Sequence, residues 1–85
     1  MSSVLDQLKQ NYIFAVIRGK SSDDAIEISK HSVLGGIKNI EVTYTTPDAS
    51  KAISELKAFY ANETEVVIGA GTIMTVELAK EAIAA

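Results

Sequence analysis

One stretch decides the fold expected for this chain of 85 residues, and it reads Ile37-Lys38-Asn39-Ile40-Glu41-Val42-Thr43-Tyr44-Thr45-Thr46. Successive side chains of a β-strand point to opposite faces, so a strand here has two unlike faces. Ile40, Val42 and Tyr44 share an apolar face that helices can cover. The other face is polar, with Asn39, Glu41, Thr43 and Thr45. It indicates either an edge strand wetted on one side or a strand that brings a carboxylate and hydroxyls to an α/β active site.

The segments around this stretch predict two more strands. Residues 13–17 are a continuous apolar run, typical of a strand covered on both faces in a parallel sheet. Residues 65–68 begin a third strand, which leads into Gly69-Ala70-Gly71-Thr72.

Helix signals alternate with these strands. A short helix is expected over residues 3–10. A second is expected to start where Ser21-Ser22-Asp23-Asp24 supplies an N-cap, and to run to about residue 34, ended by the Gly35-Gly36 pair. A third should begin with Thr46 as N-cap and Pro47 in its first turn, and a fourth at Thr75.

Strands and helices that alternate at this spacing imply parallel strands joined by right-handed crossovers. A doubly wound sheet has about five strands, and a (β/α)8 barrel has eight units in about 250 residues. Residues 1–85 supply three βα units, and residues 82–85 carry no cap, glycine or proline. We therefore expect an α/β chain truncated within or just after the helix of its third unit.

Composition excludes several classes of function. The net charge is −3 and the lysines are scattered, whereas a nucleic-acid surface needs clustered basic residues. The chain has no cysteine and one histidine, His31, so no disulfide is expected and a metal site would have to rely on carboxylates. Without a signal peptide or an apolar run of about 18 residues, it is expected to be cytoplasmic and without a membrane partner.

The glycines after the third strand permit three interpretations. Gly69-Ala70-Gly71 partly matches a dinucleotide fingerprint, but Met74 stands where a third small residue is needed, so this match is weak. The glycines could instead let backbone segments pack closely. They could also clear space for a small substrate, whose oxygens would meet Thr72 and backbone N–H groups.

Four polar residues follow or end the predicted strands: Arg18, Glu41, Thr45 and Thr72. The carboxyl ends of parallel strands form the edge at which α/β proteins bind ligands. Arginine can hold a carboxylate or a phosphate, and a buried glutamate can transfer protons. Each residue alone could be a solvated loop residue, so their joint placement is the signal for a site.

These segments resemble a known family. Five of them are similar, in order and spacing, to 2-keto-3-deoxy-6-phosphogluconate (KDPG) and 4-hydroxy-2-oxoglutarate aldolases: Ala15-Val16-Ile17-Arg18, Gly35-Gly36-Ile37, Ile40-Glu41-Val42-Thr43, Thr46-Pro47-Asp48-Ala49 and Ile68-Gly69-Ala70-Gly71-Thr72. The resemblance runs from about residue 4 to the last residue. It implies a (β/α)8 barrel, usually a homotrimer, that cleaves KDPG reversibly to pyruvate and glyceraldehyde 3-phosphate. It also implies a lysine Schiff base and no metal or other cofactor.

The resemblance also implies roles for individual residues. Glu41 corresponds to the general acid/base, and Thr72 to a contact of the pyruvate carboxylate beside the Gly69 and Gly71 backbone. Many members carry an arginine where this chain has Thr45, whereas others pair a threonine there with an arginine ending the first strand. Arg18 is therefore the expected contact to a substrate carboxylate or hydroxyl, and Thr45 a weaker candidate.

The lysine of the family lies on the sixth strand and its phosphate-binding loops follow the seventh and eighth, so this chain contains neither. None of its seven lysines matches the family position. We therefore expect residues 1–85 alone to be inactive. The alternative is a non-catalytic α/β fragment, or a module that self-associates through its open sheet edges.

Overall fold

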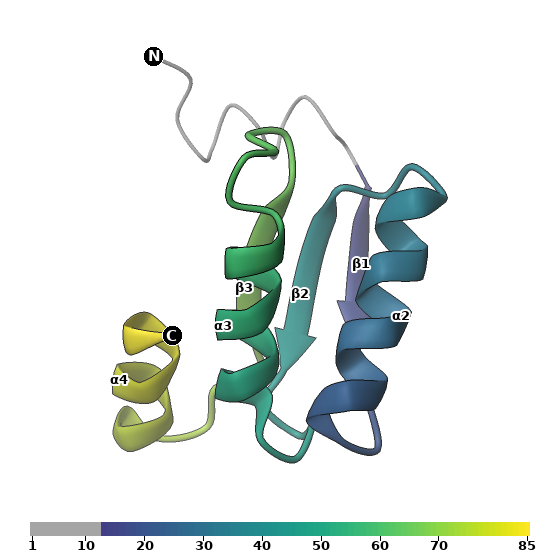
Figure 1. The fold of residues 1–85 in the computed structure, drawn as a ribbon. Helices are drawn as coiled ribbons and strands as arrows, with labels where there is room; N and C mark the ends of the chain where they lie inside the picture. Colours follow the sequence, from purple (N-terminus) through teal and green to yellow (C-terminus); the bar gives the residue numbers. More distant parts are fainter. Residues whose placement is uncertain (1–12) are drawn as a thin grey trace.

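The computed structural model describes residues 13–85, and within them it shows one parallel sheet with the strand order β1-β2-β3 (Figure 1). The strands are β1 (Phe14–Ile17), β2 (Asn39–Thr43) and β3 (Val67–Gly71), and they alternate with helices α2 (Ser22–Leu34), α3 (Ala49–Phe59) and α4 (Val76–Ala84). This confirms the predicted order of strands and helices. The structure is consistent with the start of a barrel, although the barrel itself is not seen. The helix expected over residues 3–10 lies outside the described residues.

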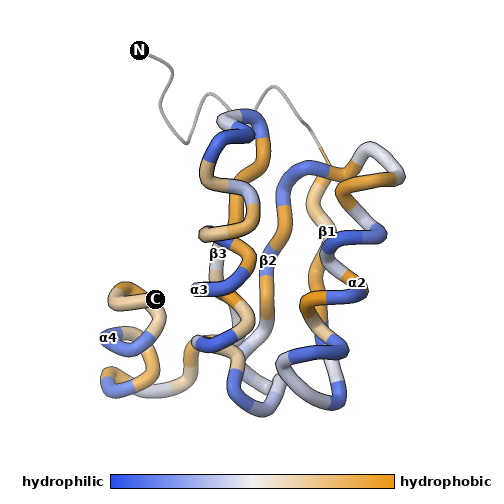
Figure 2. Tube along the Cα trace, in the orientation of Figure 1, coloured by the Kyte–Doolittle hydropathy of each residue, from blue (hydrophilic) through white to orange (hydrophobic). Residues whose placement is uncertain are grey.

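The core lies between the sheet and helices α2 and α3, which cover the same face of the sheet (Figure 1). Ile40 and Val42 point from β2 into this layer and are buried against Ala52 and Leu56 of α3. The hydropathy trace shows the same division, with apolar segments in the strands and on the inner sides of the helices (Figure 2). The predicted alternation of β2 therefore gives its apolar face to the core.

The opposite face of the sheet carries no helix in the part of the chain that the structure describes. Phe14 and Val16 of β1 point to this open face and remain 48% and 63% exposed. The expectation that the first strand is covered on both faces is therefore not met within residues 13–85. Its apolar run was a correct signal for a strand, but α2 and α3 both pack on the other face.

Helix α2 begins and ends where the sequence predicts, and α4 begins where it predicts. The side chain of Ser21 accepts a hydrogen bond from the Asp24 amide at the start of α2, and Gly36 adopts a φ of 101° just beyond its end. At the start of α4, the Thr75 hydroxyl accepts a hydrogen bond of 3.1 Å from the Leu78 amide. No helix within residues 13–85 has the length and apolar character to cross a membrane.

The prediction for the start of α3 was wrong. The helix begins at Ala49, and its N-cap residue is Asp48, which has a left-handed backbone and makes no side-chain capping bond. The Thr46 hydroxyl instead accepts a hydrogen bond from the Gly19 amide in the loop after β1. Pro47 therefore precedes the helix, because Thr46 bonds another loop and not the first turn of α3.

Candidate active site

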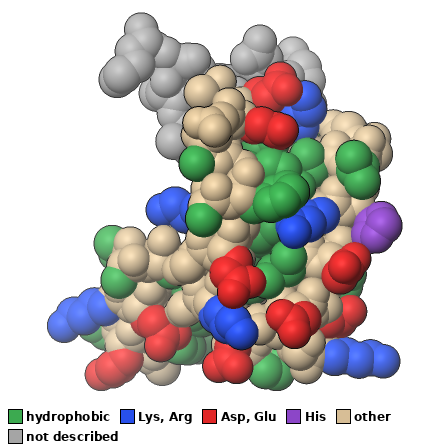
Figure 3. All heavy atoms as spheres, viewed as in Figure 1, with side chains coloured by type: hydrophobic (Ala, Val, Ile, Leu, Met, Phe, Trp, Pro, Cys, Tyr) green, Lys and Arg blue, Asp and Glu red, His purple; other side chains and the backbone are tan. Residues whose placement is uncertain are grey.

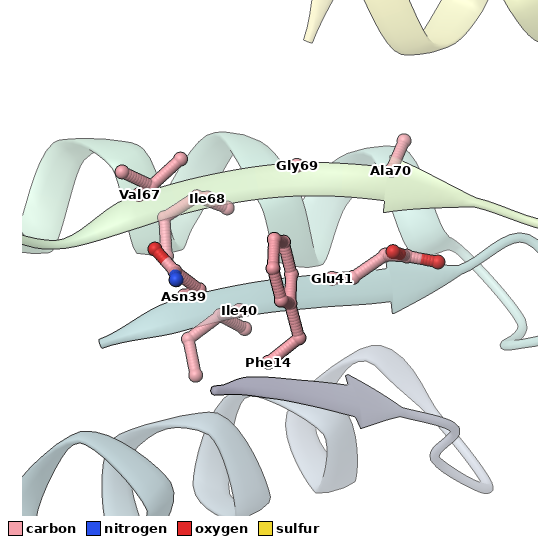
Figure 4. Close-up of a pocket in the computed structure, with 8 residues that line it drawn as sticks. All are labelled: Phe14, Asn39, Ile40, Glu41, Val67, Ile68, Gly69 and Ala70. Carbon is pink, nitrogen blue, oxygen red and sulfur yellow. The ribbon is translucent and has the colours of Figure 1, made fainter. Parts of the chain in front are cut away.

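The open face of the sheet contains a hollow of about 200 Å³, to which all three strands contribute residues (Figure 4). The Phe14 ring stands between Asn39 and Glu41, and Glu41 extends toward the carboxyl ends of β2 and β3. The strand register explains this grouping, since Glu41 lies beside Val16 on one side and Gly69 on the other. A carboxylate is thus held on the open face of the sheet, between Val16 of β1 and Gly69 of β3.

Glu41 leans over Gly71, two residues farther along β3 than its register partner. A Cβ atom placed on Gly71 would lie 2.7 Å from Cδ and 2.9 Å from Cγ of Glu41. Real side chains do not approach this closely, so the glutamate occupies space that exists because residue 71 has no side chain. The structure therefore brings together three predicted site residues: Glu41, Gly69 and Gly71.

Hydroxyl groups continue the polar surface beyond Glu41. Thr43, which is buried, and Thr45, which is exposed, place their Oγ1 atoms 2.8 Å apart. The Tyr44 amide donates to the Gly71 carbonyl at 2.9 Å, so this part of β2 stays beside β3 after the regular strand has ended. Thr45 is thereby connected to the site through Thr43.

Thr72 follows β3 with an unusual backbone. Its φ of 56° lies in the left-handed region, which a β-branched residue rarely adopts. Backbone strain of this kind concentrates at functional sites, where the surrounding structure holds it. The exposed Thr72 side chain begins the loop at the carboxyl end of β3, where the sequence predicts a substrate contact.

Arg18 lies at the same edge on the other outer strand. It is exposed and directly follows Ile17, which pairs with Val42. The loop that it enters is fixed by Gly19, which is buried and whose amide donates to Thr46 Oγ1 at 3.1 Å. Arg18 and Thr72 therefore flank the central Glu41 from β1 and β3.

Asn39 is a polar residue of this face that sequence analysis did not select for the site. It is fully buried, and its Nδ2 donates to the Ile13 carbonyl at 3.3 Å, which ties the amino end of β2 to the start of β1. Its place two residues before Glu41 puts it on the same face. That spacing was visible in the sequence, but nothing there distinguished a buried amide from a solvated one.

Two of the lysines with defined contacts, Lys30 and Lys38, lie on the helix-covered side, away from the open face. Lys38 Nζ donates to Glu65 at 2.5 Å, and Lys30 Nζ lies 3.9 Å from the centre of the Phe59 ring. Both line an apolar groove between α2 and α3 on the surface seen in Figure 3. Neither is placed to form a covalent bond to a ligand beside Glu41. Among residues 13–85, no group of three His, Cys, Asp or Glu side chains is arranged around a metal position.

The geometry thus places the Glu41 carboxylate on the open face near the carboxyl ends of the strands, with Arg18 directly after β1 and Thr72 directly after β3. Comparison with known proteins identifies the family. The model of the KDPG and KHG aldolase family matches residues 4–85. The 2-dehydro-3-deoxy-phosphogluconate aldolase of Treponema pallidum (strain Nichols) is 33% identical over 85 residues, which are 100% of this chain and 39% of the length of that relative. The chain belongs to the KDPG and KHG aldolase family.

Proposed function

We propose that this chain supplies the proton-transfer part of a class I aldolase that reversibly cleaves KDPG to pyruvate and glyceraldehyde 3-phosphate. In this proposal the Schiff-base lysine and the phosphate site come from polypeptide outside residues 1–85. The observation that carries the proposal is the placement of Glu41 on the open face, over Gly71 and toward the carboxyl edge of the sheet.

Glu41 has the chemistry that the reaction needs. When a lysine amine adds to the C2 carbonyl of the substrate, the resulting hydroxyl must be protonated before it leaves as water. The iminium ion then accepts the electron pair of the C3–C4 bond, while a base removes the proton of the C4 hydroxyl and the aldehyde departs. One carboxyl group can donate the first proton and accept the second.

The residues around Glu41 suit the carboxylate end of a keto-acid substrate. The Thr72 hydroxyl and the backbone near Gly69 and Gly71 offer hydrogen bonds, and Arg18 can form a charge-assisted pair from the other side. Thr45 is the weaker candidate, because its Oγ1 already has Thr43 Oγ1 as a neighbour at 2.8 Å. The substrate contacts of the proposal are therefore Arg18, Thr72 and the β3 backbone.

Three measurements test the proposal. The 85-residue chain should gain no covalent adduct when it is incubated with pyruvate and borohydride. In a separate assay with KDPG, it should release no pyruvate. An adduct would show that one of its own lysines is the nucleophile. In a hybrid enzyme, this chain replaces the matched 39% of the Treponema pallidum relative, and KDPG cleavage should then appear.

The Glu41→Gln substitution in the hybrid should lower kcat by about 10²- to 10⁴-fold, the usual contribution of general acid/base catalysis. Glu55→Gln is the matched control, because Glu55 is an exposed carboxylate on α3. Equal activity of the Glu41→Gln and Glu55→Gln hybrids would contradict the proposed role of Glu41.

A second function is favoured by the sheet edges. The outer edges of β1 and β3 pair with no other strand among the described residues, and such edges are templates for association with another chain. The alternative proposal is a module that assembles with further copies or with another polypeptide. Size-exclusion chromatography with light scattering tests it, since a monomer with cooperative unfolding would argue against it.

A further inference from the structure

Gly71 occupies a position at which the backbone does not require glycine. Among the described glycines, only Gly36 has a positive φ, so Gly71 has a strand conformation that any residue can adopt. It is also buried, and an alanine in a strand has a smaller entropic cost of folding than a glycine. Its backbone conformation therefore gives no reason for glycine at position 71.

The surroundings of Gly71 supply that reason. The three atoms nearest to a Cβ at this position all belong to the Glu41 side chain, and Cδ and Cγ would lie 2.7 Å and 2.9 Å away. Gly69 is the internal comparison on the same strand and the same face. A Cβ on Gly69 would meet only the Ile40 carbonyl oxygen, at 4.0 Å, which is an ordinary contact.

We infer that Gly71 is a positioning residue for Glu41: the missing side chain leaves the space in which the glutamate carboxyl lies across β3. This inference rests on the proposed function, because it names what places the proposed acid/base group. Any side chain at position 71 would make Glu41 rotate about its own flexible bonds and move its carboxyl group away from the edge of β3. The fold would survive, but the proton-transfer distance would change.

The first test needs no catalysis. In the 85-residue chain with ¹³C-labelled glutamate, the Glu41 carboxyl signal is identified by its loss in Glu41→Gln. Gly71→Ala should shift this signal, whereas Gly69→Ala should leave it nearly in place. An unshifted signal in Gly71→Ala, or an equal shift in both variants, would overturn the inference.

If Gly71→Ala does not fold, the double variant Gly71→Ala/Glu41→Ala decides the question. Recovery of the folded spectrum in the double variant would show that the obstacle is the Glu41 side chain, as inferred. Failure of both variants to fold would show that position 71 is crowded by something else, and would overturn the inference.

The second test uses the hybrid enzyme. Gly71→Ala should lower kcat by about 100-fold, the order of loss expected when a catalytic group is misplaced by about 1 Å. KM should change much less, and Gly71→Ala should cause little further loss in the Glu41→Gln background. Full activity of the Glu41→Gln hybrid would refute the proposed function and leave the carboxyl-signal result standing. A normal kcat in Gly71→Ala, with Glu41→Gln impaired, would refute the positioning role alone.

Discussion

The Thr46 hydroxyl accepts a hydrogen bond from the Gly19 amide at 3.1 Å, which joins the loop after β1 to the loop after β2. Both residues are buried, and the donor has little room to find another partner. A Cβ on Gly19 would lie 2.6 Å from the Ala25 amide nitrogen, so the start of α2 presses against this loop. The bond thus fixes the position of Arg18 relative to β2.

Thr46→Val is expected to destabilise the chain by about 1–3 kcal/mol, because it keeps the side-chain shape and leaves a buried amide without its acceptor. Urea unfolding followed by circular dichroism measures the change. Thr64→Val is the matched control, since Thr64 is exposed in the loop before β3. Equal effects of the two substitutions would mean that the bond to Gly19 contributes nothing to stability.

Thr72→Gly should stabilise the fold. A left-handed backbone costs an L-residue about 1–2 kcal/mol, and the flexibility of glycine in the unfolded state offsets about 0.5–1 kcal/mol of the gain. Asp48→Gly provides the comparison, because Asp48 has a similar φ of 54°. Aspartate tolerates this region better than a β-branched residue, so its gain should be smaller. A loss of stability in Thr72→Gly would contradict this reasoning.

The Thr72→Gly substitution should have opposite effects on stability and on activity. In the hybrid enzyme, Thr72→Gly removes the hydroxyl proposed to contact the substrate carboxylate. A hydrogen bond to a charged group contributes about 1.5–3 kcal/mol, so kcat/KM should fall by about 10- to 100-fold. Thr72→Ser retains the hydroxyl and should lose much less. Equal losses in both variants would point to the backbone, and not the hydroxyl, as the contact.

Asn39→Ala should loosen the pairing of β1 with β2. Its amide contacts the Ile13 carbonyl, and a net loss of about 1 kcal/mol is typical for one such bond. In the Asn39→Ala variant, amide hydrogen exchange should accelerate more in β1 than in β3, because β3 pairs with the other side of β2. Uniform acceleration across the sheet would instead indicate general destabilisation.

Because of Tyr60, the free energy of unfolding should decrease as the pH rises in the alkaline range. Burial, with a smaller effect from the Glu63 carboxylate, raises the pKa of Tyr60 above the ordinary value of 10.0. The folded chain therefore holds this proton at a pH where the unfolded chain has begun to lose it. The contribution of the protonated Tyr60 to stability is complete below pH 10.0 and is lost as the pH rises beyond it.

Tyr60→Phe should reduce this alkaline loss of stability, measured as the urea midpoint at a series of pH values. The substitution keeps the ring that packs edge-on against Phe59 at 4.8 Å between centroids. Glu63→Gln should act in the same direction but more weakly. An unchanged alkaline slope in Tyr60→Phe would show that this tyrosine does not control it.

The sequence predicted the larger features because they follow from local patterns. The alternation around Glu41 identified the polar face of β2. The stretch from Ser21 to Asp24 and the hydroxyl of Thr75 identified helix starts through their capping chemistry. The polar strand ends led to the hypothesis that this edge of the sheet binds a ligand, which stays a prediction. The barrel expected from the resemblance is not among these, because the described strands form only an open parallel sheet.

The features that escaped prediction depend on contacts between distant segments. Thr46 has the side chain of an N-cap residue, but its hydroxyl accepts a hydrogen bond from the amide of Gly19, which is distant in sequence. The burial of Asn39 and the position of the Glu41 carboxyl over Gly71 also depend on how three strands come together. Strand periodicity gives the face on which a side chain lies, but not its neighbour there.

The alternation of β2 has a consequence for how such a protein can evolve. Ile40 and Val42 are in the core, whereas Asn39 and Glu41 face the open side, and the alternation of the strand puts Thr43 on that side too. Folding thus depends on one set of alternate positions in this five-residue strand, and the proposed chemistry depends on the other set. Selection can change the reaction at one set of positions while the other set keeps the sheet attached to its helices, so that new specificities can arise without loss of the scaffold.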